Sequence, residues 1–345
     1  MGLDPRSASS YLAFRYLARR EWSWRPGLQP SWPEEDDRGQ VAVSTPGAIR
    51  AALSHLLARE AASPSTALLL SGGIDSAILA ALLPPGTRAY TVRFHAPGAL
   101  DESVGAAQFA TRCGLSHRVV TVTWEDHLAH IDALMRHKRS PLHPAEVGLH
   151  LAARAAAEEG ATRLVIGTGA DSTFGGLDQL LSRDWTFEEF VQRYTFLDPA
   201  LVLDVPVSMR EIFEEYRRGA CIDVQGFLKE VHGRGISQAF ANAASAAGCS
   251  LVEPYEALHL DAPLDLERIR RGESKYLLRA LFAELYPELA LPPKVAFARP
   301  MDEWLASWRP YGGSLLRADL PISQLTGEQR WLLFCLERFE RLVVN

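Results

Sequence analysis

The chain has 345 residues, of which 47% are hydrophobic and 23% charged, with a formal net charge of −6. This composition excludes disorder as the main state, and the length allows one large domain or two smaller ones. No run approaches the roughly 20 apolar residues of a membrane span, and the N-terminus lacks the pattern of a secretory signal. Four scattered cysteines form neither a disulfide framework nor a metal knuckle. We therefore expect a cytoplasmic protein.

Residues 1–60 are expected to form a helical and irregular lead-in, with an amphipathic helix at 46–62. From residue 66 the pattern changes to alternating strands and helices joined by short connections. Strands are predicted at 66–70, 87–94, 117–123 and 162–169, and helices at 74–83, 101–114 and 144–160. This order predicts an α/β fold with a doubly wound, mostly parallel sheet and helices on both faces. We expect residues 61–345 to form one such domain.

The second half of the predicted domain is mainly helical. A fifth strand is expected near 249–255. Helices are predicted at 186–194, 208–218, 224–233, 236–247, 274–286, 300–308 and 326–343. Ligands of such sheets bind beyond the carboxyl ends of the strands, so the glycine-rich segments after the first and fourth strands mark the predicted site.

The segment LLLSGGIDSA (68–77) carries the strongest functional signal. Gly72 and Gly73 directly follow an apolar strand, which lets the backbone turn and present N–H groups to a phosphate. The helix that follows adds its positive N-terminal end. Ser71 and Ser76 supply hydroxyl groups, and Asp75 supplies a carboxylate suited to Mg²⁺. The alternative is a tight turn without a ligand, which is less common for S-G-G-x-D-S in this context.

The motif SGGIDS resembles the pyrophosphate loop (PP-loop) of the ATP pyrophosphatase superfamily, whose adenine nucleotide α-hydrolase-like fold matches the one expected. The chain is more closely similar to the synthetase domain of asparagine synthetases and β-lactam synthetases. The segments that carry this resemblance follow in order: LDESVGAAQFATRCGLSH (100–117), VIGTGADSTFGG (165–176) and ESKYLLRALFAELYPELALPPKVAFARPMDEWL (273–305).

The resemblance implies a role for individual residues. Asp75 and Asp171 would share Mg²⁺ on the triphosphate of ATP, although Asp171 would also suit a loop cap. Lys294 would stabilise the acyl-adenylate, and the scarcity of lysine, four among 36 basic residues, favours this role over a solvated surface position. For Lys275 a phosphate contact and a structural ion pair are equally good interpretations. The remaining ATP-binding positions implied are Leu70, Ser71, Gly72, Gly73, Ser76, Val92, Gly167 and Thr168.

Some residues depart from the family pattern. Asparagine-forming members begin, after Met removal, with a Cys that hydrolyses glutamine, whereas Gly2 follows Met1 here and no glutaminase domain fits ahead of residue 65. Thr168 and Ser172 stand where asparagine synthetases carry glutamates. The family stretch P-F-L-D is replaced by EPYEA (253–257), which makes Glu253 and Tyr255 candidates for reshaping the second-substrate pocket. Glu102 is expected to organise the site or to favour a helix N-terminus.

Together these features predict an ATP-dependent ligase. It would adenylate a small-molecule carboxylate, release pyrophosphate, and transfer the acyl group to ammonia or an amine, with ATP and Mg²⁺ as cofactors. A separate glutaminase is one source of ammonia, and a homo-oligomer is compatible with the apolar C-terminal helix. A nucleic acid or membrane partner is not expected. The alternatives are a PP-loop tRNA-modifying enzyme and a non-catalytic nucleotide-binding homologue.

Overall fold

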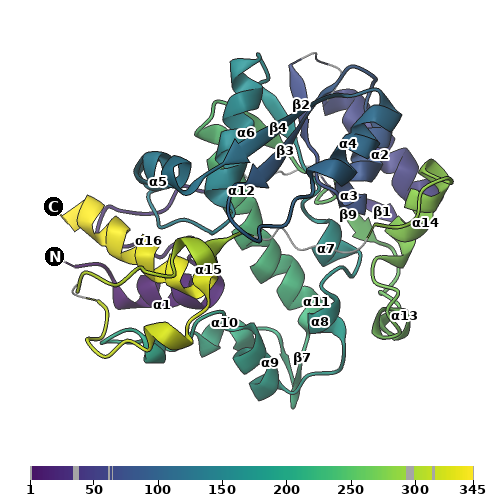
Figure 1. The fold of residues 1–345 in the computed structure, drawn as a ribbon. Helices are drawn as coiled ribbons and strands as arrows, with labels where there is room; N and C mark the ends of the chain where they lie inside the picture. The colour runs from purple at the N-terminus through teal and green to yellow at the C-terminus, as the bar shows by residue number, and fades with distance from the viewer. Residues whose placement is uncertain are drawn as a thin grey trace.

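The computed structural model describes residues 2–33, 39–60, 63, 65–292, 299–312 and 315–344. A five-stranded sheet lies at the centre of this described part of the chain (Figure 1). All neighbouring strands in it are parallel, which confirms the predicted fold class. In spatial order the strands are β4 (Ser116–Val122), β3 (Arg88–Phe94), β2 (Thr66–Leu69), β5 (Arg163–Val165) and β8 (Ser250–Val252).

The strand order changes direction at β2. The chain runs from β2 outward through β3 to β4, returns to the other side of β2 as β5, and continues outward to β8. The crevice between β2 and β5 is therefore the topological switch point, where open α/β sheets bind ligands. The loops that follow these two strands contain the two glycine-rich motifs of the sequence.

Helices cover both faces of the sheet. The longer ones are α1 (Pro5–Phe14), α2 (Pro46–Glu60), α3 (Ile74–Leu82), α4 (Ser103–Cys113), α5 (Trp124–Lys138), α6 (Glu146–Glu158), α9 (Phe187–Tyr194), α12 (Arg234–Ser245), α14 (Tyr276–Leu285) and α16 (Gly327–Val344). The shorter elements are α7 (Ala170–Thr173), α8 (Asp178–Leu181), η1 (Pro199–Leu201), α10 (Arg210–Glu214), α11 (Val224–Phe227), the π-helix η2 (Leu228–Gly233), α13 (Leu266–Arg270), α15 (Met301–Trp304), η3 (Ile322–Gln324), and strands β1 (Val41–Val43), β6 (Arg217–Arg218), β7 (Cys221–Ile222) and β9 (Leu258–Leu260).

Alternating residues of the central strands enter two different cores. Leu68 and Ala89 point to the face covered by α2, α3, α4 and α14. Ala67, Tyr90 and Leu164 belong to the opposite core, which α6 and α12 cover. Because successive side chains of a strand point to opposite faces, a strand with apolar residues at both odd and even positions must be buried on both faces of the sheet. This explains why the strands appear as continuous apolar runs in the sequence.

The two ends of the chain pack together in a further core. Figure 1 shows α1 and α16 side by side, with both termini near them. Tyr11 Oη and Trp331 Nε1 donate to the same carbonyl oxygen, that of Leu142, at 2.7 and 3.1 Å. The predicted lead-in thus shares a core with the C-terminal helix. The division of the chain at residue 60 remains a prediction.

A buried ion pair joins α5 to α6. Lys138 and Glu146 are both fully buried and contact each other directly. Glu146 Oε2 also accepts from Asn242 Nδ2 at 2.8 Å, and the carboxylate accepts from the His143 N–H at 2.6 Å. Since buried charges are stable only when paired and hydrogen-bonded, this network fixes the relative position of α5, α6 and α12.

Several predicted elements differ from those observed. The helix α5 was not predicted, although Thr123 and Asp126 form a capping box at its start. The single helix expected at 208–218 is instead the short α10 followed by β6, which pairs with β7 across a turn at Gly219 (φ 63°). The helix expected at 300–308 ends at Trp304. The parallel pair β1 and β9 joins segments more than 200 residues apart, which local patterns do not reveal.

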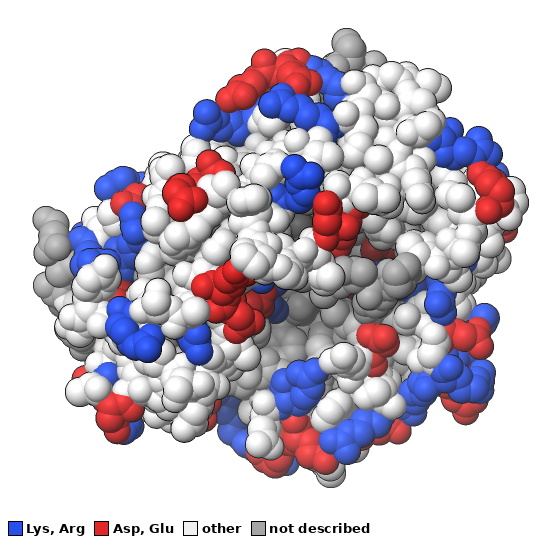
Figure 2. Space-filling view, in the orientation of Figure 1, with Lys and Arg blue, Asp and Glu red and all other residues white. Residues whose placement is uncertain are grey.

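The surface carries charges of both signs. On the face shown in Figure 2, basic and acidic side chains alternate, and no continuous basic area is visible. Among the described residues no helix is both long and apolar enough to cross a membrane.

Candidate active site

The SGG loop connects β2 to α3. Ser76 Oγ lies 3.0 Å from both the backbone nitrogen and the Oγ of Ser71, so the loop is closed by its own hydroxyl groups. Gly73 is the N-cap of α3 and provides no side-chain hydrogen bond to the first turn. The first backbone N–H groups of α3 therefore have no capping side chain, and the helix dipole favours an anion there.

The end of β5 packs closely against the start of α3. A Cβ atom on Gly167 would lie 3.1 Å from the Asp75 Cβ, so glycine allows the two backbones to approach. Tyr255 Oη donates to the Asp75 carbonyl oxygen at 2.9 Å from a fully buried position. These contacts fix the backbone of Asp75 at the switch point.

Asp75, Asp171 and Lys275 meet above this loop. Lys275 Nζ lies 2.5 Å from Asp75 Oδ2 and 2.9 Å from Asp171 Oδ1. Burial alone would lower the pKa of the Lys275 ammonium, but the two carboxylates outweigh it and the pKa is raised. A Cβ on Gly176 would overlap Asp171 Oδ1 and Lys275 Cε, at 1.9 and 2.2 Å, so glycine is required beside this triad. The lysine thus holds together the two carboxylates that the sequence predicted as metal ligands.

Glu102 contacts the loop from the opposite side. It is the N-cap residue of α4, and its Oε2 accepts the Gly72 N–H at 3.3 Å. Burial raises the pKa of the Glu102 carboxyl, and the Gly72 N–H acts in the opposite direction. Glu102 thus stands at the start of α4 and contacts the loop, while its role in organising the site remains a prediction.

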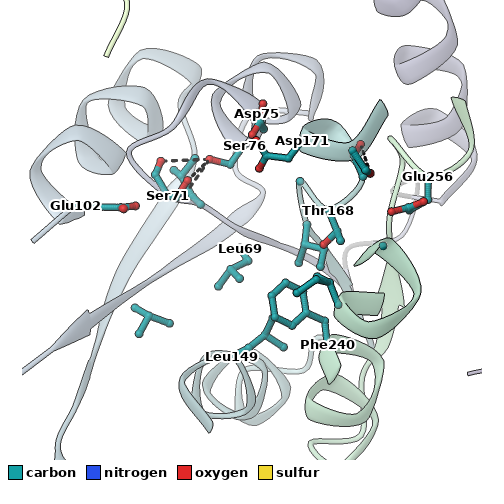
Figure 3. A pocket seen from close by; sticks show the side chains of 18 of the residues that line it. Leu69, Ser71, Asp75, Ser76, Glu102, Leu149, Thr168, Asp171, Phe240 and Glu256 are labelled. Atoms are coloured by element: carbon teal, nitrogen blue, oxygen red, sulfur yellow. Dashed lines mark hydrogen bonds between the residues drawn. The ribbon is translucent and has the colours of Figure 1, made fainter. Parts of the chain in front are cut away.

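A cavity of about 320 Å³ opens beside the loop, at the carboxyl ends of β2 and β5 (Figure 3). It brings together eight of the predicted site residues: Leu70, Ser71, Asp75, Ser76, Val92, Gly167, Thr168 and Asp171. Gly72, Gly73 and Lys275 do not line the cavity but contact residues that do. Lys294 lies outside the described residues, so its role remains a prediction.

Two parts of the cavity were not predicted. Leu69, Leu149, Ile166 and Phe240 give it an apolar wall between β2, β5, α6 and α12. On the other side, Glu256, His232 and Gly233 line it from the β8–β9 connection and from η2. Segments of π-helix are frequent at functional sites, but one irregular turn inside a helical pattern leaves no clear signal in a sequence.

The departures from the family pattern have different structural consequences. Thr168 and Ser172 line the cavity, as expected for residues that replace family glutamates. Tyr255 is buried under Asp75 and does not line it. Glu253 is held by Ser237, whose hydroxyl donates to Oε1 at 3.0 Å. Burial and the neighbouring Glu256 charge raise the pKa of Glu253 to about 7, although the Ser237 and Thr168 side chains act in the opposite direction.

The fold and this loop define the class of the protein. A parallel sheet with an SGGxDS loop at its switch point is the arrangement of the PP-loop superfamily. The family model described as asparagine synthase matches residues 48–245. The chain therefore belongs to the asparagine synthase family, whose members are ATP-dependent ligases.

The comparisons with individual proteins are weaker. Twenty-six chains of solved structures match. One of them is the U34-tRNA thiolase NcsA from Methanococcus maripaludis with its [4Fe-4S] cluster, at 14% sequence identity, 76% coverage of this chain, 84% coverage of that chain and a TM-score of 0.29. A similarity of this size supports no inference about function. No curated protein matches the sequence.

Proposed function

We propose that this protein is an amide-forming ligase that adenylates a small-molecule carboxylate and transfers the acyl group to ammonia or an amine. The observation that carries the proposal is the convergence of Asp75 and Asp171 on one cation, directly beside an uncapped helix N-terminus. One part of the cavity thus suits a metal-bound phosphate chain. The apolar wall formed by Leu69, Leu149 and Phe240 suits the adenine ring.

The residues present fit Mg²⁺. Asp75 and Asp171 both lie within 3 Å of a single nitrogen atom, so their oxygens are close enough to share one cation. Two carboxylates combined with substrate phosphates are the usual protein ligands of Mg²⁺. When bound, Mg²⁺ would neutralise charge that develops on the phosphates. We expect Lys275 to move from the carboxylates to a phosphate oxygen at that stage.

The proposed reaction has two steps. A carboxylate oxygen of the substrate attacks the α-phosphorus of ATP, the bond between the α-phosphorus and the bridging oxygen breaks, and pyrophosphate leaves from the SGG loop. A nitrogen nucleophile then attacks the acyl carbon of the adenylate, AMP leaves with the carbon–oxygen bond electrons, and the nitrogen gives up a proton. The chain contributes mainly positioning and electrostatic stabilisation, as is usual for phosphoryl transfer. The sequence places Lys294 in the second step.

ATP–pyrophosphate exchange across a panel of carboxylic acids tests the proposal. We expect exchange with at least one acid and release of AMP when an amine is added. ATP binding without exchange for any acid would favour the non-catalytic homologue. AMP release that depends on a tRNA instead of an acid would favour the tRNA-modifying enzyme.

Two variants separate the steps. Asp75→Ala should abolish exchange, because it removes one of the two carboxylates at the phosphate chain. Lys294→Ala should retain ATP–pyrophosphate exchange and lose amide formation, because Lys294 is proposed to act in the second step. An Asp75→Ala protein that exchanges at the wild-type rate would contradict the proposed site.

A further inference from the structure

One acidic residue that lines the cavity, Glu256, lies away from the phosphate-binding loop. Figure 3 shows Glu256 on the opposite side of the cavity from Ser71 and Glu102. The backbone of Glu256 is held by its N–H bond to the Glu253 carbonyl at 3.1 Å and by the Gln40 amide, which donates to the Glu256 carbonyl at 2.8 Å. A Cβ on Gly169 would lie only 2.8 Å from the Glu256 nitrogen. The position of Glu256 is therefore fixed by its own backbone and by the end of β5.

The Glu256 carboxylate lacks a protein partner on one oxygen. Its Oε1 is buried and accepts no hydrogen bond in the described structure. Gly233, which also lines the cavity, leaves space at this atom, since even an added Cβ would remain 3.9 Å away. Burial raises the pKa of the Glu256 carboxyl, and the Lys229 charge acts in the opposite direction. Lys229 Nζ donates to Gln40 Oε1 at 3.0 Å, and the described residues show no ion pair between Lys229 and Glu256.

The charges around Glu256 call for an additional cation. Glu253 does not line the cavity, but its carboxyl group is close enough to Glu256 for the two like charges to repel each other. The third titratable group, His232, stays neutral because burial and Arg15 lower its pKa to about 3, although Asp171 opposes this shift. None of the described residues that line the cavity is a lysine or arginine. A buried carboxylate is stable only when a positive charge or several donors compensate it.

We propose that Glu256 binds a protonated amino group of the substrate. The inference rests on the proposed function, because Glu256 lines the same cavity that is proposed to bind ATP. An organic ammonium group fits a single unpaired carboxylate oxygen better than a metal ion such as Ca²⁺, which takes six to eight oxygen ligands. The substrate class is thus a small molecule with a primary amine.

The first test needs no ligand. An unpaired buried carboxylate destabilises the free protein, so Glu256→Gln should raise the unfolding midpoint by about 2 °C. A carboxylate with a structural role would give a lower midpoint when replaced. Glu211→Gln on α10, an exposed position outside the cavity, is the matched control and should not shift the midpoint.

The second test uses the reaction. The probes are ethanolamine, 1,4-diaminobutane and glycine as amines, and β-alanine and 4-aminobutyrate as acids that carry an amino group, each compared with its analogue that lacks nitrogen. In Glu256→Gln the KM for the amine should rise about 30-fold, because the charge-assisted contact is lost, whereas the KM for ATP should change less than threefold. If the bound amino group is the nucleophile, Glu256→Gln should show normal ATP–pyrophosphate exchange and impaired amide formation. If the amino group belongs to the carboxylic acid substrate, ATP–pyrophosphate exchange itself should be impaired.

The outcomes separate the two proposals. Absence of exchange in the wild-type protein with every acid would count against the proposed function. In that case the ammonium site is tested by calorimetry, which measures the affinity of 1,4-diaminobutane for wild-type and Glu256→Gln proteins loaded with α,β-methylene-ATP. Equal KM values for the two proteins, equal calorimetric affinity, or preference for the probes without nitrogen would overturn the ammonium site.

Discussion

Replacement of Lys275 by Met tests whether this lysine holds the carboxylates of Asp75 and Asp171, the proposed metal ligands, together. The substitution keeps most of the side-chain volume and removes the charge that lies 2.5 Å from Asp75 and 2.9 Å from Asp171. Breaking a buried ion pair costs about 3–5 kcal/mol. The Asp171 side chain is 48% exposed, so water screens part of the resulting repulsion. We therefore expect the free energy of unfolding to fall by about 2 kcal/mol.

For a chain of 345 residues this loss lowers the unfolding midpoint by about 3 °C. Scanning calorimetry without nucleotide measures it directly. Mg²⁺ should restore the midpoint of Lys275→Met, because a divalent cation replaces the missing charge between the carboxylates. Mg²⁺ should leave the unfolding midpoint of the wild-type protein almost unchanged. Electron paramagnetic resonance of Mn²⁺ should show an affinity on the order of tenfold higher in the variant.

Arg271→Gln provides the matched control. It removes an ion pair with Glu267 in which the two side chains are 62% and 85% exposed, so its effect on stability should be under about 0.5 kcal/mol. A Lys275→Met protein with the wild-type midpoint, or with unchanged Mn²⁺ affinity, would refute the view that Lys275 bridges the two carboxylates.

Three further measurements test other parts of the structure. The pKa of Glu253 is raised from 4.5 to about 7, so the folded state holds this proton more tightly than the unfolded state, and stability falls as the pH rises from 4.5 to about 7. In denaturant unfolding, Glu253→Gln should be more stable than wild type at pH 8 by up to about 3 kcal/mol, with little difference at pH 5. Gly176→Ala should destabilise the protein by about 1–3 kcal/mol and weaken ATP binding in calorimetry, whereas Gly47→Ala, with open space around it, should be neutral. Glu146→Gln should lower the free energy of unfolding by about 3 kcal/mol, because it leaves Lys138 unpaired. Loss of the exposed ion pair between Arg154 and Glu158 should cost under about 0.5 kcal/mol, and equal effects of the two changes would contradict the structural role of the buried pair.

The sequence predicted the sheet and its nucleotide loop because both follow from short-range patterns. Short apolar runs specify buried parallel strands, and each of the five strands of the central sheet overlaps a segment where a strand was predicted. The pair Gly72 and Gly73 marks a strand-to-helix turn whatever the rest of the chain does. Asp171 could be placed near Asp75 because parallel strands end at the same edge of a sheet.

Local patterns were less informative where tertiary contacts decide the conformation. The helix α5 does carry a local signal that the prediction missed, because Thr123 and Asp126 form a capping box and the buried His127, Ile131 and Met135 are spaced four residues apart. The region 208–218 has good helix formers, but α10 ends at Glu214 and Arg217–Arg218 pair with β7. Tertiary contacts override propensity in this second region.

The sequence alone determined the fold class, the family and the phosphate-binding half of the site. These depend on a strand–loop–helix unit and on motifs whose residues are close together in the chain. Only the tertiary structure decided that Lys275 joins Asp75 to Asp171, and that Glu256 forms the wall facing the loop. These contacts join segments that are 80 to 200 residues apart, and their geometry depends on how η2, α12 and α14 pack on the sheet. A linear pattern carries no information about such packing, so the Glu256 end of the cavity became visible only in three dimensions.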